Sequence, residues 1–332
     1  MSTLFSPLSF AGLTLRNRVG MPPMWSGKAT AEGFVTPAIV DYHRVRAAAG
    51  TGLVIVEHSF VHPQGRHSST QIGVHDDACV EGLSRLAAAI RAEGSVACLQ
   101  ISHAGARASA RVTGLPVVAP SPVPTTRESD PDAPRELTRS QIADIVEAFA
   151  AAAARARTAG FDAIEIHAAH GFLLSQFLSP LTNRRSDEYG GDHDRRGRIH
   201  MDVLAAVRRR AGQDFPVFVR LGLHDERPGG LTLAPACVTA SQLAAAGAAL
   251  IDVSGGLAGS DDPGRGPGYF VGYAEALKAE VNVPVLVAGG IADPRMADLI
   301  IRSRRADIVG IGRAMLDDPE WTRTAAAALG QT

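Results

Sequence analysis

The sequence predicts an α/β fold, a TIM (β/α)8 barrel, on three observations. Eight short apolar runs recur along the 332 residues, and helix-like segments lie between them. The runs are continuously apolar rather than alternating, which is typical of parallel strands buried on both faces. No GxGxxG follows the first run, although that motif commonly marks the alternative, a doubly wound open sheet. Eight such units therefore favour a barrel in which residues 1–332 form one domain.

The expected strands are these eight runs. They are residues 17–23, 52–58, 95–101, 162–168, 216–222, 249–255, 283–289 and 306–312. The amphipathic segments between them predict helices at 77–93, 139–158, 196–211, 235–246, 271–279 and 293–303. Thr138 with Gln141 fits a capping box at the start of one of these helices.

Two segments fall outside the repeating units. Residues 1–16 predict a small β cap over the bottom of the barrel. Residues 103–137, after the third strand, are rich in proline, serine and charge, and they exceed the length of an ordinary loop. Because such long excursions in compact domains are commonly functional, we expect a lid or subdomain there.

The composition excludes several classes of protein. With 33 basic and 34 acidic residues, the net charge of −1 gives no electrostatic footprint for nucleic acid or an anionic membrane. Cys79, Cys98 and Cys237 form no CxxC, so we expect no disulfide framework and a reducing cytoplasm. The first residues lack the basic start and the apolar core typical of a signal peptide, so we expect none. No uninterrupted apolar run approaches the length of about 18 residues that a membrane span needs. We expect a soluble cytoplasmic protein.

The candidate functional residues lie where the expected strands end. In a TIM barrel the active site is built at the C-terminal ends of the strands. The residues at these ends are Pro23, Met24, Trp25, Glu57, His58, Gln100, His103, His167, His170, Arg220, Ser254, Gly289, Gly290, Gly312 and Arg313. We therefore expect these residues to meet around one pocket.

Two glycine turns predict a phosphate site. Gly289-Gly290 and Gly312-Arg313 follow the seventh and eighth strands, whose loops bind phosphate in many barrels. Glycine lets backbone N–H groups approach an anion closely, and helix N-termini favour negative charge. Turns after strands also favour glycine for purely structural reasons, but two pairs in the two expected loops favour phosphate.

Arg220 and the histidine pair admit more than one interpretation. A buried arginine at a strand end needs an acceptor, either a ligand or an ion-pair partner among Glu57, Glu165 and Asp252. His167 and His170 are three apart, a loose metal pattern, and the first strand lacks the histidines common in zinc barrels. We therefore expect no metal. Two neutral imidazoles can instead donate hydrogen bonds to one substrate oxygen and polarise a carbonyl.

Together these residues resemble the Old Yellow Enzyme family, the FMN-dependent ene-reductases, and within it the short bacterial type. The resemblance extends over about residues 4–321. It is carried by residues 165–191, Leu15-Arg16-Asn17-Arg18, Pro23-Met24, Gln100, His103-Ala104-Gly105, Arg220, Pro267-Gly268-Tyr269, Gly289-Gly290-Ile291 and Gly312-Arg313.

The resemblance implies non-covalent FMN, with NAD(P)H as reductant. The residues implied in FMN binding are Pro23, Met24, Gln100, Arg220, Gly289, Gly290, Gly312 and Arg313. Gln100 would meet the pyrimidine edge, and Arg220 the N1/O2 end, where a reduced flavin carries negative charge. Flavin binding is then preferred over a structural ion pair as the interpretation of Arg220. The two glycine loops would hold the FMN phosphate.

The same resemblance implies ping-pong reduction of activated C=C bonds. His167 and His170 would be the catalytic pair that clamps the oxygen of the activating group. The substrate-binding residues would be Trp25, His58, Phe172 and Tyr269. The alternatives are a desaturase or isomerase of a cyclic carbonyl compound, a non-enzymatic flavin protein and a metal-dependent hydrolase. The oligomeric state stays open between a homodimer and a homotetramer.

Three residues depart from the family pattern. Phe172 occupies the place of a tyrosine that is the family's candidate proton donor. Trp25 stands where relatives often carry cysteine, and we expect its indole near the flavin edge rather than in the core. His58 replaces a small residue. It would either hydrogen-bond to the flavin or the substrate, or lie behind them with its hydrogen bonds made within the protein. Residues 183–191 would be a structural loop in which Tyr189 packs rather than reacts.

Overall fold

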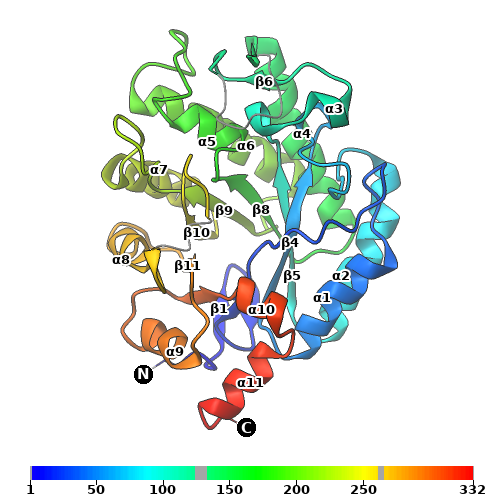
Figure 1. The fold of residues 1–332 in the computed structure, drawn as a ribbon, viewed down its shortest axis with the longest axis vertical. Helices are drawn as coiled ribbons and strands as arrows, with labels where there is room; N and C mark the ends of the chain where they lie inside the picture. Colours follow the sequence, from blue (N-terminus) through cyan, green and yellow to red (C-terminus); the bar gives the residue numbers. More distant parts are fainter. Residues whose placement is uncertain (1, 124–132, 261–264, 332) are drawn as a thin grey trace.

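The computed structural model describes residues 2–123, 133–260 and 265–331. In these ranges eight parallel strands close into a barrel, in the order β10-β11-β12-β3-β4-β5-β8-β9 (Figure 1). Along the chain they are β3 (Val19–Met21), β4 (Leu53–Phe60), β5 (Val96–Ser102), β8 (Ala163–Ala168), β9 (Val217–Gly222), β10 (Leu250–Ser254), β11 (Val285–Ala288) and β12 (Ile308–Gly310). The predicted barrel is confirmed, and each of its strands overlaps a predicted one.

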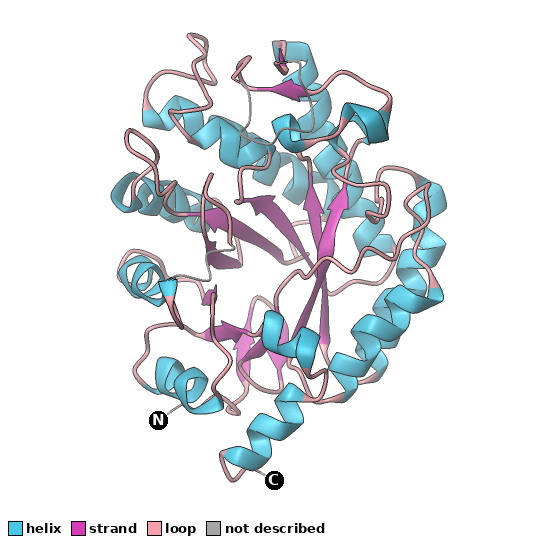
Figure 2. Cartoon of the chain, viewed as in Figure 1, coloured by secondary structure: helices cyan, strands magenta, loops and turns pink. Residues whose placement is uncertain are grey.

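Helices surround the barrel (Figure 2). The longer ones are α1 (Pro37–Ala48), α2 (Val80–Ala92), α4 (Arg139–Thr158), α6 (His193–Ala211), α7 (Leu233–Ala245), α8 (Val271–Lys278), α9 (Pro294–Arg302) and α11 (Trp321–Ala328). Shorter ones are α3 (Ala110–Thr113), α5 (Leu173–Leu178) and α10 (Arg313–Asp317). The predicted capping box opens α4, since the Thr138 side chain accepts from Gln141 N and the Gln141 side chain from Thr138 N.

Helix α1 was not predicted, because its buried face is partly polar. It begins after the N-cap Thr36 with Pro37 in its first turn, both favourable at a helix start. Its buried residues include His43 and Arg46. The Arg46 guanidinium donates to the carbonyl of Met315, which joins α1 to α10. An apolar periodicity cannot reveal a helix whose buried side carries such groups.

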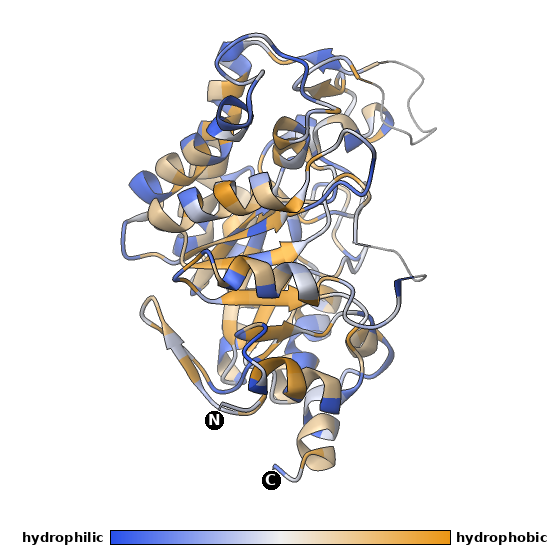
Figure 3. Cartoon of the chain, turned by 90° about the vertical axis from the view of Figure 1, so that its left-hand side faces the viewer, coloured by the Kyte–Doolittle hydropathy of each residue, from blue (hydrophilic) through white to orange (hydrophobic). Residues whose placement is uncertain are grey.

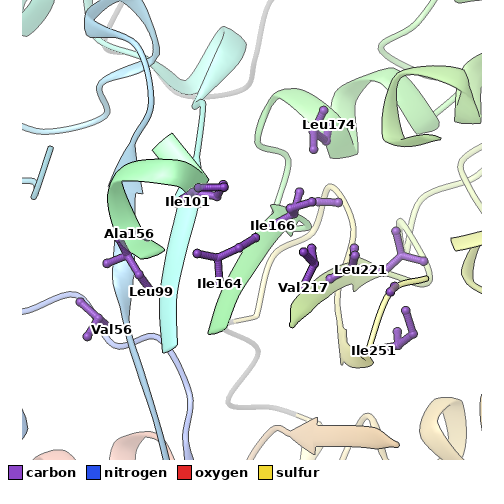
Figure 4. Close-up of a cluster of buried hydrophobic side chains, with 14 of the residues drawn as sticks. Val56, Leu99, Ile101, Ala156, Ile164, Ile166, Leu174, Val217, Leu221 and Ile251 are labelled. Carbon is purple, nitrogen blue, oxygen red and sulfur yellow. The ribbon is translucent and has the colours of Figure 1, made fainter. Parts of the chain in front are cut away.

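The core has an inner and an outer part. Inside the barrel one cluster holds Leu53, Ile55, Cys98, Phe218 and Leu286, and all are fully buried. A larger cluster fills the space between strands and helices, where Ala156 of α4 and Leu174 of α5 lie near strand residues (Figure 4). The strands therefore pack apolar side chains on both faces, and Figure 3 shows the central strands largely in the hydrophobic colour. This arrangement explains the continuous apolar runs in the sequence.

The N-terminal segment forms an antiparallel hairpin. Its strands are β1 (Leu8–Phe10) and β2 (Leu13–Leu15). Leu15 is fully buried and belongs to the inner barrel cluster, and Leu8, Phe10 and Leu13 pack against that cluster. The hairpin therefore contacts the apolar interior of the barrel.

The excursion after the third barrel strand contains α3 and two short strands. β6 (Val118–Ala119) pairs in parallel with β7 (Arg135–Glu136). Residues 124–132 of the expected excursion 103–137 lie outside the described residues. Buried Arg185 donates to the carbonyls of Pro120 and Leu137, at 3.0 and 2.6 Å, and so attaches the excursion to the loop at 183–191.

The described ranges contain no helix with both the length and the apolar character needed to cross a membrane. Cys79, Cys98 and Cys237 are buried free thiols.

Candidate active site

One cavity of about 690 Å³ lies at the C-terminal ends of the strands. Every barrel strand contributes a residue near its C-terminal end, and the volume falls in the range of small-molecule sites. Glu57 was expected at this pocket but is not among its lining residues. The predicted residues that do line the cavity are Pro23, Met24, Trp25, His58, Gln100, His167, His170, Phe172, Arg220, Tyr269, Gly289, Gly290, Gly312 and Arg313. His103 is not among the lining residues, and its Nδ1 accepts from the backbone of Gly105.

The histidine pair is formed by the sharp turn after β8. His170 (φ 57°) and Gly171 (φ 66°) both adopt the left-handed conformation, which brings the rings of His167 and His170 to 4.9 Å. His170 Nε2 lies 2.6 Å from Ser254 Oγ, and His167 Nδ1 is buried without a hydrogen-bond partner. Burial, followed by neighbouring positive groups, lowers the pKa of both rings well below 6.5. Two neutral imidazoles, each with one N–H donor, thus lie against the cavity.

Arg220 lies over a buried acidic network. Its Nε is 3.1 Å from Asp252 Oδ2. The structural ion pair, which the resemblance had made the less favoured interpretation of Arg220, is therefore present in the structure. Burial raises the pKa of Asp252 to about 6. Burial and the Asp252 charge raise the pKa of Glu165 well above its ordinary value, and Gln100 Nε2 donates to Glu165 at 2.8 Å. Arg220 also lines the cavity, so its cation is shared between this network and the ligand space.

Glu57 holds the loop that follows β3. Its carboxylate accepts hydrogen bonds from Ser26 N at 2.6 Å and from Ser26 Oγ at 3.0 Å. Burial raises the pKa of Glu57 to about 7. The same loop places Trp25 at the cavity with 53% of its surface exposed. Core packing, the structural alternative for Trp25, is therefore wrong.

Phe172 lies among imidazole rings. It is 5% exposed, and its ring centroid is 4.6 Å from that of His167, 5.3 Å from His58 and 5.7 Å from His67. Arg107, from the turn after β5, donates to the carbonyl of His170 and lies 6.0 Å from the Phe172 ring centre. The cavity wall at the family's tyrosine position therefore has no hydroxyl.

Sequence reasoning missed the supporting residues of this wall. Arg107 and His67 line the cavity, but no spacing motif marks them. Ser254 was placed at a strand end without a role, and the structure brings its hydroxyl to His170. Only its position at the end of an expected strand could have identified it. Tyr189 packs in the 183–191 loop, where its hydroxyl donates to Asp202 at 3.0 Å.

The last two strand loops have the backbone expected of glycine turns. Gly289 (φ 128°) and Gly290 (φ 66°) adopt conformations that side chains disfavour. Helix α9 then begins at Pro294 after the N-cap Asp293, and α10 begins at Arg313. Arg313 Nη2 is 3.3 Å from the Tyr269 hydroxyl, so cation and ring lie together.

This donor set fits FMN. The cations of Arg220 and Arg313 line the cavity and suit an anionic ligand. Gln100 adds an amide, and the glycine turns leave backbone close to the cavity. In the part of the chain that the structure describes, no three His, Cys, Asp or Glu side chains converge to hold a metal ion.

Comparisons with known proteins give the family of this chain. Residues 3–331 match the NADH:flavin oxidoreductase / NADH oxidase family. The chain is 40% identical to an NADH oxidase of Thermoanaerobacter brockii, over 97% of this chain and 50% of that protein. It is 39% identical to an NADPH dehydrogenase of Bacillus licheniformis, over 98% and 94%. A solved Old Yellow Enzyme homologue from Zymomonas mobilis superposes with a TM-score of 0.86 at 27% identity, covering 98% of this chain and 93% of its own.

The barrel and these relatives define a class of flavin oxidoreductases. The chain belongs to the NADH:flavin oxidoreductase / NADH oxidase family, and the resemblance to Old Yellow Enzyme is confirmed. The chain spans about half the length of the first curated relatives it matches.

Proposed function

We propose that this protein reduces activated C=C bonds, as in enones, with NAD(P)H in a ping-pong sequence. The observation that carries the proposal is the neutral pair His167 and His170, with ring centroids 4.9 Å apart at the cavity. The similarity of the chain to NADPH dehydrogenases supports NAD(P)H as the reductant. The single substrate class that such a pair suits is a small molecule with a carbonyl or similar acceptor beside the double bond.

FMN is the cofactor in this proposal. Pro23, Met24, Gln100 and Arg220 would hold its ring system. Gly289, Gly290, Gly312 and Arg313 would hold its phosphate. When bound, FMN supplies the hydride chemistry, and the protein supplies placement and electrostatics.

The histidine pair would stabilise charge on the substrate oxygen. As hydride reaches the β-carbon, negative charge grows on that oxygen, and preorganised donors in a water-poor site stabilise it most strongly. Ser254 Oγ bonds His170 Nε2 and so helps to orient the ring. Trp25, His58, Phe172 and Tyr269 would shape the rest of the substrate space. The low pKa of both histidines supports donation by neutral rings.

Protonation of the α-carbon separates this proposal from its main alternative. Phe172 has no proton to give, which weakens reduction more than it weakens hydride removal from a saturated ketone. A desaturase or double-bond isomerase of cyclic carbonyl compounds is therefore the second candidate. It would use the same cofactor residues and the same histidine pair.

One experiment distinguishes the two. Purified holoenzyme is assayed without oxygen, first with NADPH and cyclohex-2-enone and then, fully oxidised, with cyclohexanone. The reductase proposal expects NADPH consumption coupled to cyclohexanone formation. Flavin bleaching by cyclohexanone without enone reduction would establish the alternative, and a protein that takes up no FMN would overturn both.

We further propose that the protein works in the cytoplasm. Three buried free thiols support a reducing cytoplasm. A homodimer or homotetramer is proposed for the assembly, and sedimentation velocity measures it directly.

A further inference from the structure

His58 lies where β4 breaks its regular pairing with β5. Val56 pairs with Leu99, but Ser59 pairs with Ile101, so β4 has one more residue than β5 between these pairs. A bulge of this kind interrupts the alternation of side chains and re-aims one of them. His58 lies within the bulge and lines the cavity, half-buried.

Gln71 fixes which nitrogen of His58 carries the proton. The side chain of Gln71 is fully buried. Its Oε1 accepts from His67 N at 2.7 Å, and its Nε2 donates to His58 O at 3.1 Å. A backbone N–H only donates and a carbonyl only accepts, so the amide has one orientation. The same Nε2 donates to His58 Nδ1 at 2.8 Å, which leaves the proton of the neutral ring on Nε2.

His58 is a hydrogen-bond donor rather than an acid. Burial, then the neighbouring His67, lowers its pKa to about 3, so the ring is neutral near pH 7. The amide of Gln71 cannot resupply a proton as a carboxylic acid would. Within the described residues the Nε2 of His58 has no hydrogen-bond partner. This N–H is therefore available to a ligand acceptor.

His58 and the histidine pair contact the same apolar ring. The Phe172 centroid lies 5.3 Å from that of His58 and 4.6 Å from that of His167. The wall of the cavity thus offers two sites of neutral donors with a hydrocarbon surface in contact with both. A complementary ligand has two acceptor groups joined by a short carbon skeleton.

We propose that His58 is a second hydrogen-bond donor to the substrate, and that the cavity selects alkenes flanked by two carbonyl groups, such as cyclic ene-1,4-diones. The inference depends on the proposed function, because it gives the first carbonyl oxygen to His167 and His170. His58 is then a specificity-determining residue, and a simple enone leaves its N–H unpaired.

Binding to the oxidised holoenzyme tests this without turnover. 4-Hydroxybenzaldehyde and 4-methylphenol are titrated, with the long-wavelength flavin band as the signal. Both place a phenol oxygen at the histidine pair, but only the aldehyde has a second acceptor. His58→Leu should weaken 4-hydroxybenzaldehyde about fivefold to tenfold relative to 4-methylphenol, the usual effect of one neutral hydrogen bond. His58→Gln, which keeps a donor, should restore most of that ratio.

Turnover gives a second readout. The ratio of kcat/KM for cyclohex-2-ene-1,4-dione to that for cyclohex-2-enone should fall by a similar factor in His58→Leu. Comparing variants cancels the intrinsic difference in reactivity between the two alkenes.

The possible failures are distinguishable. If neither phenol perturbs the flavin in the parent protein, the proposed function fails. If both phenols bind but their affinity ratio is the same in all three proteins, only the role of His58 is overturned. Equal weakening of both phenols in His58→Leu would also overturn it, because His58 would then support the site without meeting the second acceptor.

Discussion

At the scale of single residues, His167 and His170 offer the most direct test of the site. Replacing either by alanine removes one donor from the substrate oxygen. Losing one donor of such a site typically costs about a hundredfold or more in rate, or roughly 3 kcal/mol. We therefore expect His167→Ala and His170→Ala to lose most enone reduction and the charge-transfer band of bound 4-chlorophenol, measured by stopped flow and titration.

The control for these variants is His193→Ala. His193 begins α6 and its Nε2 contacts Thr239, away from the cavity lining. It should bind phenol and turn over like the parent. If both clamp variants also behave like the parent, the histidine pair does not hold the substrate oxygen.

Phe172 makes a second prediction at this scale. A positioned acid typically speeds a proton-transfer step about 10²–10⁴-fold. Phe172→Tyr supplies a hydroxyl beside His167 and should speed enone reduction wherever protonation limits the rate. Its solvent isotope effect on the oxidative half-reaction should fall, while flavin reduction by NADPH should change less. An oxidative rate and isotope effect that stay unchanged across several enones would show that water already protonates efficiently.

At the scale of elements, Arg185 joins two loops above the barrel. It is 7% exposed, pairs with Asp187 at 2.6 Å and donates to the carbonyls of Pro120 and Leu137. Lysine keeps the charge but not the planar fork of donors. Arg185→Lys should lower the free energy of unfolding by about 2–3 kcal/mol, as measured by urea denaturation. Amide exchange at β6 and β7 should accelerate.

Arg184→Lys is the matched control, because Arg184 is exposed. It should change the free energy of unfolding by less than about 0.5 kcal/mol. Equal effects of the two substitutions would mean that the excursion is not held by Arg185.

The pH dependence of the Arg185 effect has a definite sign. The Arg185 hydrogen bonds lower the pKa of Asp187 below 3.8. A depressed carboxyl pKa stabilises the fold above its unfolded value and loses this effect as pH falls through the folded value. The difference in unfolding free energy between parent and Arg185→Lys should therefore shrink in acid. A constant difference from pH 7 to below pH 4 would assign the whole effect to the two carbonyls.

At the scale of the whole molecule, FMN should stabilise the fold. A ligand that binds only the native state adds about 2.7 kcal/mol when its free concentration is 100 times Kd. The melting temperature of the protein should rise by several degrees on FMN addition to stripped protein. Riboflavin at the same concentration should raise it less, because it lacks the phosphate assigned to Gly290 and Arg313. Equal shifts in melting temperature with FMN and riboflavin would show that those loops do not bind the phosphate.

Much of this architecture could be predicted from sequence because strands buried on both faces have a simple signature. The bounds of α4 matched the structure, since Thr138 and Gln141 mark its start. Helix α1 was not predicted, because its buried face includes the polar residues His43 and Arg46. The β4 bulge could not be foreseen, since it depends on pairing with β5 rather than on local composition.

The candidate site divides in the same way. Residues at strand ends, such as Gln100 and Arg220, could be placed at the cavity because parallel strands end on one side of a barrel. Arg107 and His67 could not, because they reach the cavity from loops whose path depends on tertiary contacts. The ion pair between Arg220 and Asp252 was one of several combinations that the sequence allowed.

The contacts of Arg185 also bear on how such a barrel can be recombined. Loops at strand ends are often treated as separate modules that can be exchanged between related proteins. Here the excursion 103–137 and the loop 183–191 share one buried guanidinium, through Pro120, Leu137 and Asp187. A chimera that takes one loop without the other would leave the buried guanidinium without its acceptors, or the acceptors without their donor. These two loops must therefore be exchanged together.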